Sequence, residues 1–215
     1  MATLNRKIPS KIKNNDLVDK RREQIFQATS KLIRKKGFHK TTMRDISKES
    51  GISLGNLYDY IRKKEDILYL FHDRVAQIIV NEMKEMGEDP GGPVQKLRKL
   101  IEGELETRDR YQDLIMTIYQ ESHSLSKASL KSLLINEEAN MERYQQVIKE
   151  GIEIGVFKQA NPAMLANLIK MMIECWVLRR WTLRGKVSLE EMKKGVVELV
   201  QNGIIHKANE SNSKT

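Results

Sequence analysis

Apolar residues near the start of the chain recur at the spacing of an α-helix. Within residues 21–36 they gather on one helical face: Ile25, Ala28, Leu32 and Ile33. Gly37 follows this segment in the position of a C-cap. Residues 1–20 show no apolar periodicity and mix lysine with asparagine, aspartate and serine. We therefore predict a helix over residues 21–36 that follows a mobile, basic N-terminal arm.

Two further short helices are predicted before residue 62. Thr41 or Thr42 is placed to cap the segment MRDISKES, which ends at Gly51. Ser53 is placed to cap the segment LGNLYDYI. Three short helices joined by glycine-containing turns are typical of a helix-turn-helix domain.

Longer helical segments follow. The first is predicted from near residue 64 to Gly87 and is followed by the loop EDPGGP. Further helices are expected near residues 94–108, 111–123, 127–154, 161–184 and 188–205. The last one begins with a capping box formed by Ser188 and Glu191. No strand-like alternation persists, so the predicted fold class is all-α, with a three-helix N-terminal domain followed by a larger helical domain.

The positive charge of the chain is concentrated near its N-terminus. The net charge is +9. Residues 1–64 hold 17 lysines and arginines against 6 aspartates and glutamates, whereas residues 65–215 hold 21 against 23. Such a local excess attracts a polyanion and speeds its capture. Charge alone leaves two interpretations open, namely a nucleic-acid-binding surface or a solvated face whose lysines aid solubility.

The composition is that of a globular protein. Apolar residues make up 40% and charged residues 31% of the chain, which excludes a disordered protein. The single cysteine, Cys175, excludes an internal disulfide and suits a reducing compartment. The chain lacks the run of about 20 apolar residues that a membrane helix needs, and its N-terminus lacks the apolar stretch of a signal peptide. We therefore expect a soluble, cytoplasmic protein with no membrane partner.

The stretch GFHKTTMRDISKESGISLGNLYDYIRKKEDIL resembles the signature of the TetR family of transcriptional regulators (TetR/AcrR-like proteins). The resemblance covers residues 21–70, and its hallmarks keep the family's order and spacing: Gly37, Phe38, Thr41, Thr42, Ile46, Gly51, Gly55, Leu57, Tyr58, Tyr60, Lys64 and Glu65. Two positions depart from the family pattern. Asp59 stands where a neutral or basic residue is usual, and Ile61 where phenylalanine is commoner. A carboxylate at Asp59 repels phosphate, yet it can accept a hydrogen bond from a cytosine amino group.

The resemblance implies that different segments of the chain have different functions. We expect a basic arm over residues 1–20 and a helix-turn-helix DNA-binding domain over 21–65. A ligand-binding and dimerisation domain is expected over 66–206, and a polar tail over 207–215. The family's partners are a double-stranded DNA operator, a small-molecule inducer and a second copy of the chain. We expect the fourth helix to link the two domains, with Lys64 on DNA while Phe71 and Val75 face the ligand domain.

A helix-turn-helix inserts its recognition helix into the major groove. The resemblance and the chemistry of the residues together predict these DNA contacts: Thr42, Arg44, Ser53, Gly55, Asn56, Tyr58, Tyr60 and Lys64. Gly55 is small enough to let the backbone approach DNA, and Asn56 can pair with adenine through its amide. The alternative for Asn56 is an exposed polar residue without a DNA role, and for Tyr58 it is core packing, for which Leu57 is the better candidate. The arm is left open as a DNA contact or a solubilising tail.

Motifs of enzymes are missing from the sequence. It has no Gly-rich phosphate loop, HExxH motif, CxxC pair or nucleophile elbow. The histidines are scattered along the chain: His39, His72, His123 and His206. We therefore predict no enzymatic activity, no cofactor and no metal site. A ligand-independent architectural DNA-binder and a purely structural helical module are the alternatives; the size of the C-terminal domain disfavours the first and the helix-turn-helix signature disfavours the second.

The segment NPAMLANLIKMMIECWVLRRWTLRG is apolar on two sides, which indicates burial on two sides. In TetR-like proteins the last two long helices of each protomer form a four-helix dimer interface. From this resemblance we expect the following interface residues: Ile173, Trp176, Arg180, Met192, Val196 and Val200. The alternative is that Trp176 completes the core of one protomer.

The remaining helices are expected to enclose an inducer cavity. The predicted wall residues are Met116, Tyr119, Met141, Tyr144, Met171, Met172, Cys175 and Trp181. A methionine-rich wall suits a lipophilic ligand, and it suits an ordinary packed core equally well. Several basic residues are available to an anionic headgroup: Arg108, Arg110, Arg179, Arg180 and Arg184.

The sequence therefore predicts a TetR-type repressor, a homodimer on a pseudo-palindromic operator. Its release is expected from a small apolar or amphipathic inducer, with a fatty acyl-CoA as the first candidate. The alternatives are a multidrug-responsive repressor of an efflux gene and a ligand-independent DNA-binding protein.

Overall fold

The computed structural model of this chain describes residues 12–64, 66–71, 74, 91–125 and 127–206. Within these residues the regular structure is helical, with no β-strand and one isolated bridge between Phe157 and Ile205. The chain forms two compact units. Unit 1 holds Met1–Ile78 and Tyr111–Asn136, and unit 2 holds Ile79–Arg110 and Glu137–Thr215. The predicted all-α fold class is confirmed.

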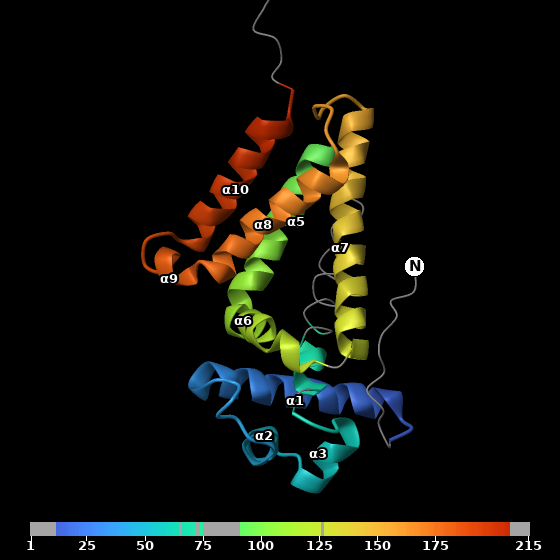
Figure 1. Ribbon diagram of the computed structural model, residues 1–215, viewed down its shortest axis with the longest axis vertical. Helices are drawn as coiled ribbons and strands as arrows, with labels where there is room; N and C mark the ends of the chain where they lie inside the picture. The colour runs from blue at the N-terminus through green and yellow to red at the C-terminus, as the bar shows by residue number, and fades with distance from the viewer. Residues whose placement is uncertain (1–11, 65, 72–73, 75–90, 126, 207–215) are drawn as a thin grey trace, which may run out of the picture. The chain divides into compact units, whose positions relative to one another are not determined.

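Unit 1 is built around a long first helix. Its helices are α1 (Asn15–Lys36), α2 (Met43–Ser50), α3 (Leu54–Tyr60) and α6 (Gln112–Glu121), followed by the 3-10 turn η1 (Ser122–Ser124). Figure 1 shows α2 and α3 on one side of α1 and α6 on the other. Residues 66–71 are also helical. The predicted helix from residue 64 to Gly87 lies mostly outside the described residues.

The first helix begins earlier than the sequence pattern predicts. The side chain of Asn14 accepts a hydrogen bond from the amide of Leu17 (3.1 Å) and so caps α1 before residue 15. Val18 is buried in the core of unit 1. Residues 15–20 are therefore helical and are not part of a mobile arm, because one cap and one buried side chain suffice to extend the helix.

The other caps in unit 1 are those that the sequence predicts. Thr42 and Asp45 form a capping box at the start of α2, and Ser53 caps α3. Gly51 has φ +70°, the left-handed conformation that glycine tolerates best, and it makes the turn between α2 and α3. These caps define the helix-turn-helix.

The core of unit 1 joins segments that are far apart in sequence. The rings of Phe26 on α1 and Phe71 meet edge to face, with centroids 5.2 Å apart. Tyr111 and Leu114, near the start of α6, pack into the same core. The ring of Phe71 is therefore buried in a core that includes α1 as well as α6, which lies within the predicted ligand domain. Val75, also predicted to face the ligand domain, lies outside the described residues.

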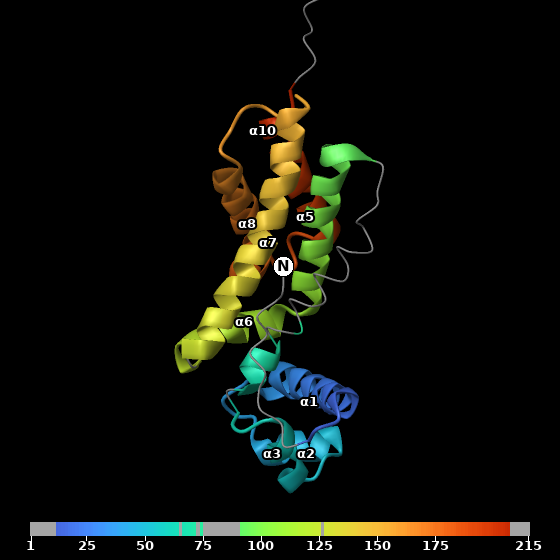
Figure 2. The same cartoon turned by 90° about the vertical axis from the view of Figure 1, so that its right-hand side faces the viewer.

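Unit 2 is a second helical bundle. It contains α5 (Gly92–Arg110), most of α7 (Lys127–Glu153), α8 (Pro162–Leu178), α9 (Arg180–Leu183) and α10 (Leu189–Ile204). Figure 2 shows α5, α7 and α8 side by side, and α10 packs against α5 and α8. The helix predicted over 161–184 breaks at Arg179, whose backbone leaves the helical region (φ −105°, ψ 15°). In the described part of the chain, no helix has both the length and the hydropathy to cross a membrane.

Candidate functional site

The third helix has one buried face and one exposed face. Leu57 is fully buried and anchors α3 in the core of unit 1. Gly55, Asn56 and Tyr58 are exposed on the outer face, and Tyr58 retains 45% of its accessible surface. Within the described residues no hydrogen bond engages the side chain of Asn56 or Tyr58, so both polar groups are available to a ligand. The outer face of α3 is thus polar, small at its start and open.

The glycine at position 55 is not required by the fold of the protomer. Its φ is not in the positive range, and a Cβ built at Gly55 would meet no atom of the chain within 4 Å. A residue with a side chain therefore fits the free protein. A glycine here leaves room for close approach by another molecule.

The start of α2 presents a second set of predicted contacts. Thr42 and Arg44 are exposed beside Asp45. The hydroxyl of Thr42 donates to a carboxylate oxygen of Asp45 (2.6 Å), and Lys36 pairs with the same oxygen (2.7 Å). Lys36 and then Thr42 lower the pKa of Asp45, which therefore stays ionised. The Thr42 hydroxyl thus serves primarily as a helix cap, whereas no ion pair within the described residues involves Arg44.

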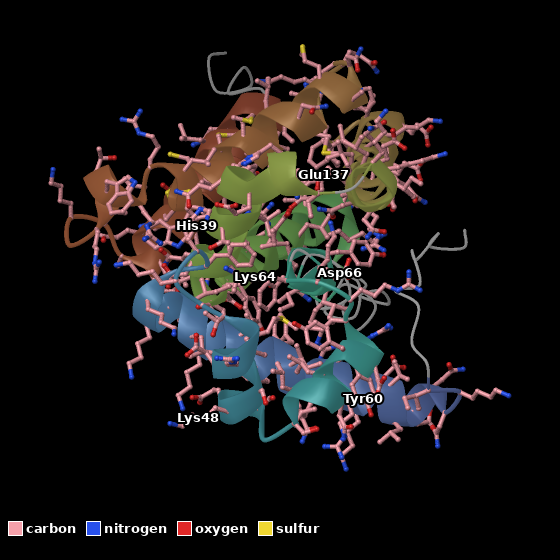
Figure 3. The ribbon with its side chains drawn as sticks, turned by 60° about the horizontal axis from the view of Figure 1, so that its bottom comes forward. His39, Lys48, Tyr60, Lys64, Asp66 and Glu137 are labelled. Carbon is pink, nitrogen blue, oxygen red and sulfur yellow. The ribbon has the colours of Figure 1, made fainter. Side chains whose placement is uncertain are left out.

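Lys64 is held against the turn between α1 and α2 (Figure 3). Its Nζ donates to the carbonyl oxygen of His39 (3.3 Å) and lies 4.1 Å from the centroid of the Phe38 ring. The side chain is half-buried, so its position is defined by packing as well as by charge. This geometry places a fixed positive charge beside the helix-turn-helix.

Asp66 is a positioning residue that the sequence prediction missed. It is buried, and one of its carboxylate oxygens accepts hydrogen bonds from the amides of Arg62 and Lys63, both at 3.1 Å. The side chains of Arg62 and Lys63 are exposed. An aspartate three residues after Lys63 is a spacing typical of side-chain caps, and this was the signal that the sequence offered.

Tyr60 is not a surface residue. It is 6% exposed and packs in the core of unit 1 together with Leu57. The prediction that Tyr60 contacts DNA is therefore corrected, because its ring faces inward while that of Tyr58 faces outward. Neighbouring aromatic residues two positions apart lie on different sides of a helix.

The end of α6 is tied to the helix-turn-helix within unit 1. His39 Nε2 lies 2.7 Å from a carboxylate oxygen of Glu121, and Glu121 is nearly buried. His39 also provides the carbonyl that Lys64 contacts. One turn therefore joins α6 to the candidate DNA-binding surface.

The predicted ligand-binding residues fall into three environments. Met116 and Tyr119 belong to unit 1, where Met116 is half-buried and Tyr119 is exposed. Met141 and Tyr144 are buried in the core of unit 2, and Met172 and Cys175 are half-buried there. Like Tyr119, Met171 and Trp181 are exposed, and these three residues are therefore not walls of an interior cavity in the protomer. Their role as inducer contacts is withdrawn for that reason.

The predicted dimer residues lie mainly inside the protomer. Four of them are in the core of unit 2: Ile173, Trp176, Val196 and Val200. The indole N–H of Trp176 donates to a carboxylate oxygen of Asp109 on α5 (3.0 Å), which fixes the ring within its own chain. Only Arg180 and Met192 keep partial exposure. The assignment of the first four to a dimer interface is corrected, since they have almost no surface left for a partner.

Comparison with known proteins accounts for both parts of the chain. Residues 25–69 match the family described as "Bacterial regulatory proteins, tetR family", and residues 90–204 match "Tetracyclin repressor-like, C-terminal domain". The HTH-type transcriptional regulator HbdR of Aromatoleum sp. (strain CIB) is 27% identical over 196 residues, which cover 90% of this chain and 85% of that protein. The fatty acid metabolism regulator protein of Bacillus subtilis (strain 168) is 27% identical over 188 residues, with 86% and 95% covered.

A solved structure shares the fold. AibR, in complex with isovaleryl coenzyme A and operator DNA, superposes with a TM-score of 0.69 at 18% identity, covering 83% of this chain and 97% of that chain. The curated relatives are transcriptional regulators, not enzymes. The match over residues 90–204 covers more than half of the chain. The capped helix-turn-helix and the exposed face of α3 agree with this family match. This protein belongs to the TetR family of helix-turn-helix DNA-binding transcriptional regulators.

Proposed function

We propose that this protein is a repressor that binds a pseudo-palindromic operator as a homodimer and leaves it when an acyl-CoA thioester binds. The outer face of α3 is the main support for DNA binding. Asn56 and Tyr58 are exposed there, beside Gly55, which has open space around it. These groups, with Thr42, Arg44, Ser53 and Lys64, form the proposed DNA-binding surface. Phosphate contacts position such a helix, and base-edge contacts by Asn56 and Arg44 supply specificity.

The proposed dimer uses the exposed stripe of α8. Four large apolar side chains lie along one helical face with substantial exposure: Met164, Leu168, Met171 and Leu178. Leu199 on α10, a helix that packs against α8, is also exposed. A contiguous exposed apolar surface marks an interaction site. A second copy of the chain is its proposed occupant, because one recognition helix reads only a few base pairs and a two-fold protein reads two half-sites.

The proposed inducer class rests on two relatives and on the apolar interior of unit 2. One relative is named for fatty acid metabolism, and AibR was solved with isovaleryl coenzyme A. Met141, Met172 and Cys175 of unit 2 supply buried or half-buried apolar surface for an acyl chain. Binding of an acyl-CoA to one conformation of the dimer shifts the population away from the operator-competent state. The contact between His39 and Glu121 is the proposed last step by which inducer binding affects the DNA-binding surface.

Fluorescence anisotropy with labelled DNA from upstream of the protein's own gene tests this proposal. We expect nanomolar to micromolar binding that is weakened in Tyr58→Ala and released by acyl-CoAs in a chain-length-dependent manner. Reciprocity requires that operator DNA weaken acyl-CoA binding by the same factor. Release by cationic lipophilic drugs and not by any acyl-CoA would replace the proposed inducer class with a multidrug one. Failure to bind any DNA from that region would contradict the proposal that the protein is a repressor with its operator upstream of its own gene.

A further inference from the structure

Six polar side chains meet inside unit 2, where α5, α7 and α8 pack together. Each of these residues is less than one-tenth exposed: Glu104, Arg108, Asn140, Tyr144, Lys170 and Glu174. They come in pairs from the three helices, two from each. A polar cluster of this size in a core requires a reason, because removing polar groups from water is unfavourable unless each finds a partner.

Both carboxylate oxygens of Glu104 have partners within the protein. One of its carboxylate oxygens accepts from Arg108 (2.7 Å), Asn140 Nδ2 (3.3 Å) and Lys170, and the other accepts from the hydroxyl of Tyr144 (2.6 Å). Burial alone would raise the pKa of Glu104, but Arg108 and Lys170 outweigh burial and lower its pKa to about 2. Glu104 is therefore ionised and has its donors within the protein.

The two cations of the cluster, Arg108 and Lys170, are each paired with carboxylates. Arg108 contacts both Glu104 and Glu174, and Lys170 contacts Glu104 and lies 3.6 Å from Glu137. The cluster therefore holds three carboxylates against two cations when the half-exposed Glu137 is included. It has no unmatched positive charge for a ligand carboxylate or phosphate. The sequence-based expectation that Arg108 meets an anionic headgroup is corrected on this ground.

Two acceptor atoms are left without a donor. In the described part of the chain no donor reaches Asn140 Oδ1 or Glu174 Oε2, although both residues are more than nine-tenths buried. Asn140 directs its amide nitrogen to Glu104, and Glu174 uses Oε1 alone for both contacts with Arg108. The two atoms come from different helices, α7 and α8. Apolar residues such as Met141 and Ile173 are next to them in sequence and belong to the same core.

We propose that this cluster is a ligand subsite that selects a hydroxyl group on the apolar part of the inducer. Each of these acceptors can take a hydrogen bond from one hydroxyl, and a neutral hydroxyl loses less on leaving water than an ammonium does. Within the acyl-CoA class, on which this inference rests, the preferred inducer carries a hydroxyl on its acyl chain or ring. A site built to hydrogen-bond a hydroxyl rejects the analogue that lacks it far more strongly than an apolar pocket distinguishes a methylene.

Matched ligand sets test the inference by isothermal titration calorimetry on the full-length protein. The first set contains acyl-CoAs that carry, at one carbon, a hydrogen, a hydroxyl or a methoxy group. The second set contains free alcohols and their methyl ethers, which need no CoA. We expect the hydroxyl compound to bind at least about tenfold more tightly than its hydrogen and methoxy partners for the best-placed carbon. A hydroxyl preference only in the free alcohols would support the subsite and contradict the CoA thioester as inducer.

A variant separates recognition from folding. Asn140→Leu removes the unpartnered oxygen, while Glu104 keeps Arg108, Lys170 and Tyr144 as partners. We expect this variant to fold and to bind the deoxy ligand as the parent does, but to lose most of the hydroxyl preference. Asn167→Leu, at an exposed position of α8, is the matched control and should keep the preference. Equal affinity for hydroxyl, hydrogen and methoxy compounds in both ligand sets would overturn the subsite while leaving an acyl-CoA inducer intact.

Discussion

The ammonium group of Lys64 lies 4.1 Å from the centroid of the Phe38 ring. The ring face is electron-rich and holds the cation, and the carbonyl of His39 holds it from another direction at 3.3 Å. Both contacts come from the turn between α1 and α2. A lysine restrained in this way loses little further entropy when it binds a phosphate, so it suits a fixed phosphate contact in DNA.

Lys64→Ala is therefore expected to weaken operator binding and to lower the slope of log affinity against log salt by about one unit. The loss of one phosphate contact releases fewer counterions, which is the reason for the smaller slope. Anisotropy titrations at several salt concentrations measure both quantities. Lys194→Ala, on the exposed side of α10, is the control and should change neither. An unchanged slope in Lys64→Ala would exclude Lys64 from the interface.

Tyr58 and Tyr60 should respond to substitution in opposite ways. Tyr58→Ala is expected to leave thermal stability nearly unchanged and to remove about 1.5–3 kcal/mol of operator binding, the usual range for a hydrogen bond to a charged group. Tyr60→Ala opens a cavity in the core of unit 1 and should destabilise folding by about 3 kcal/mol. Differential scanning fluorimetry and anisotropy on both variants distinguish them. A stable Tyr60→Ala with a pure binding defect would show that Tyr60 faces DNA.

Gly55→Ala is expected to stabilise the free protein while weakening its complex with DNA. Alanine is favoured over glycine in a helix by about 0.8–1 kcal/mol, and a Cβ at position 55 meets nothing within 4 Å. On the operator the added methyl group occupies space that the backbone of α3 needs. Urea unfolding and operator titration of the same preparation give both values. Unimpaired operator binding would show that DNA does not approach position 55.

The buried carboxylate of Glu104 predicts how unit 2 responds to acid. Its pKa is lowered from 4.5 to about 2 in the folded chain, so its stabilising contribution is present above pH 4.5 and is lost as the pH falls towards 2. Urea unfolding of the parent protein and of Glu104→Gln between pH 7 and 3 measures this effect. The variant should be less stable at pH 7 by about 3–5 kcal/mol, because it removes the buried carboxylate that pairs with both Arg108 and Lys170. Its deficit should shrink as the pH falls; a constant deficit would contradict the assigned ionisation.

The dimer proposal is tested on the exposed stripe of α8. The double variant Leu168→Glu/Met171→Glu places charges on this surface without touching the core, and we expect it to sediment as a monomer of 24.9 kDa. Its affinity for a full operator should fall to that for a half-site. Ile154→Glu, an equally exposed apolar position in the turn after α7, is the control and should stay dimeric. A parent protein that sediments as a monomer would contradict the dimer itself.

The local structure of the helix-turn-helix follows from short-range signals in the amino-acid sequence. The caps at Thr42 and Ser53 and the turn at Gly51 depend on residues within a few positions of one another, so their signals are complete in the sequence. The inward position of Leu57 likewise follows from the apolar period of α3. Because these interactions are short-range, the family's spaced motif specifies both the fold of this region and its DNA-binding role.

Which face of each helix is buried depends on how the helices pack against one another. The period of α8 indicates two apolar faces, but it does not say that Ile173 packs inward while Met171 remains exposed. The partners of Glu104 are also invisible locally, since Lys170 lies 66 positions away and Asn140 lies 36. Helical periodicity reports how side chains are spaced around one axis, whereas burial and ion pairing depend on which other helix lies against each face.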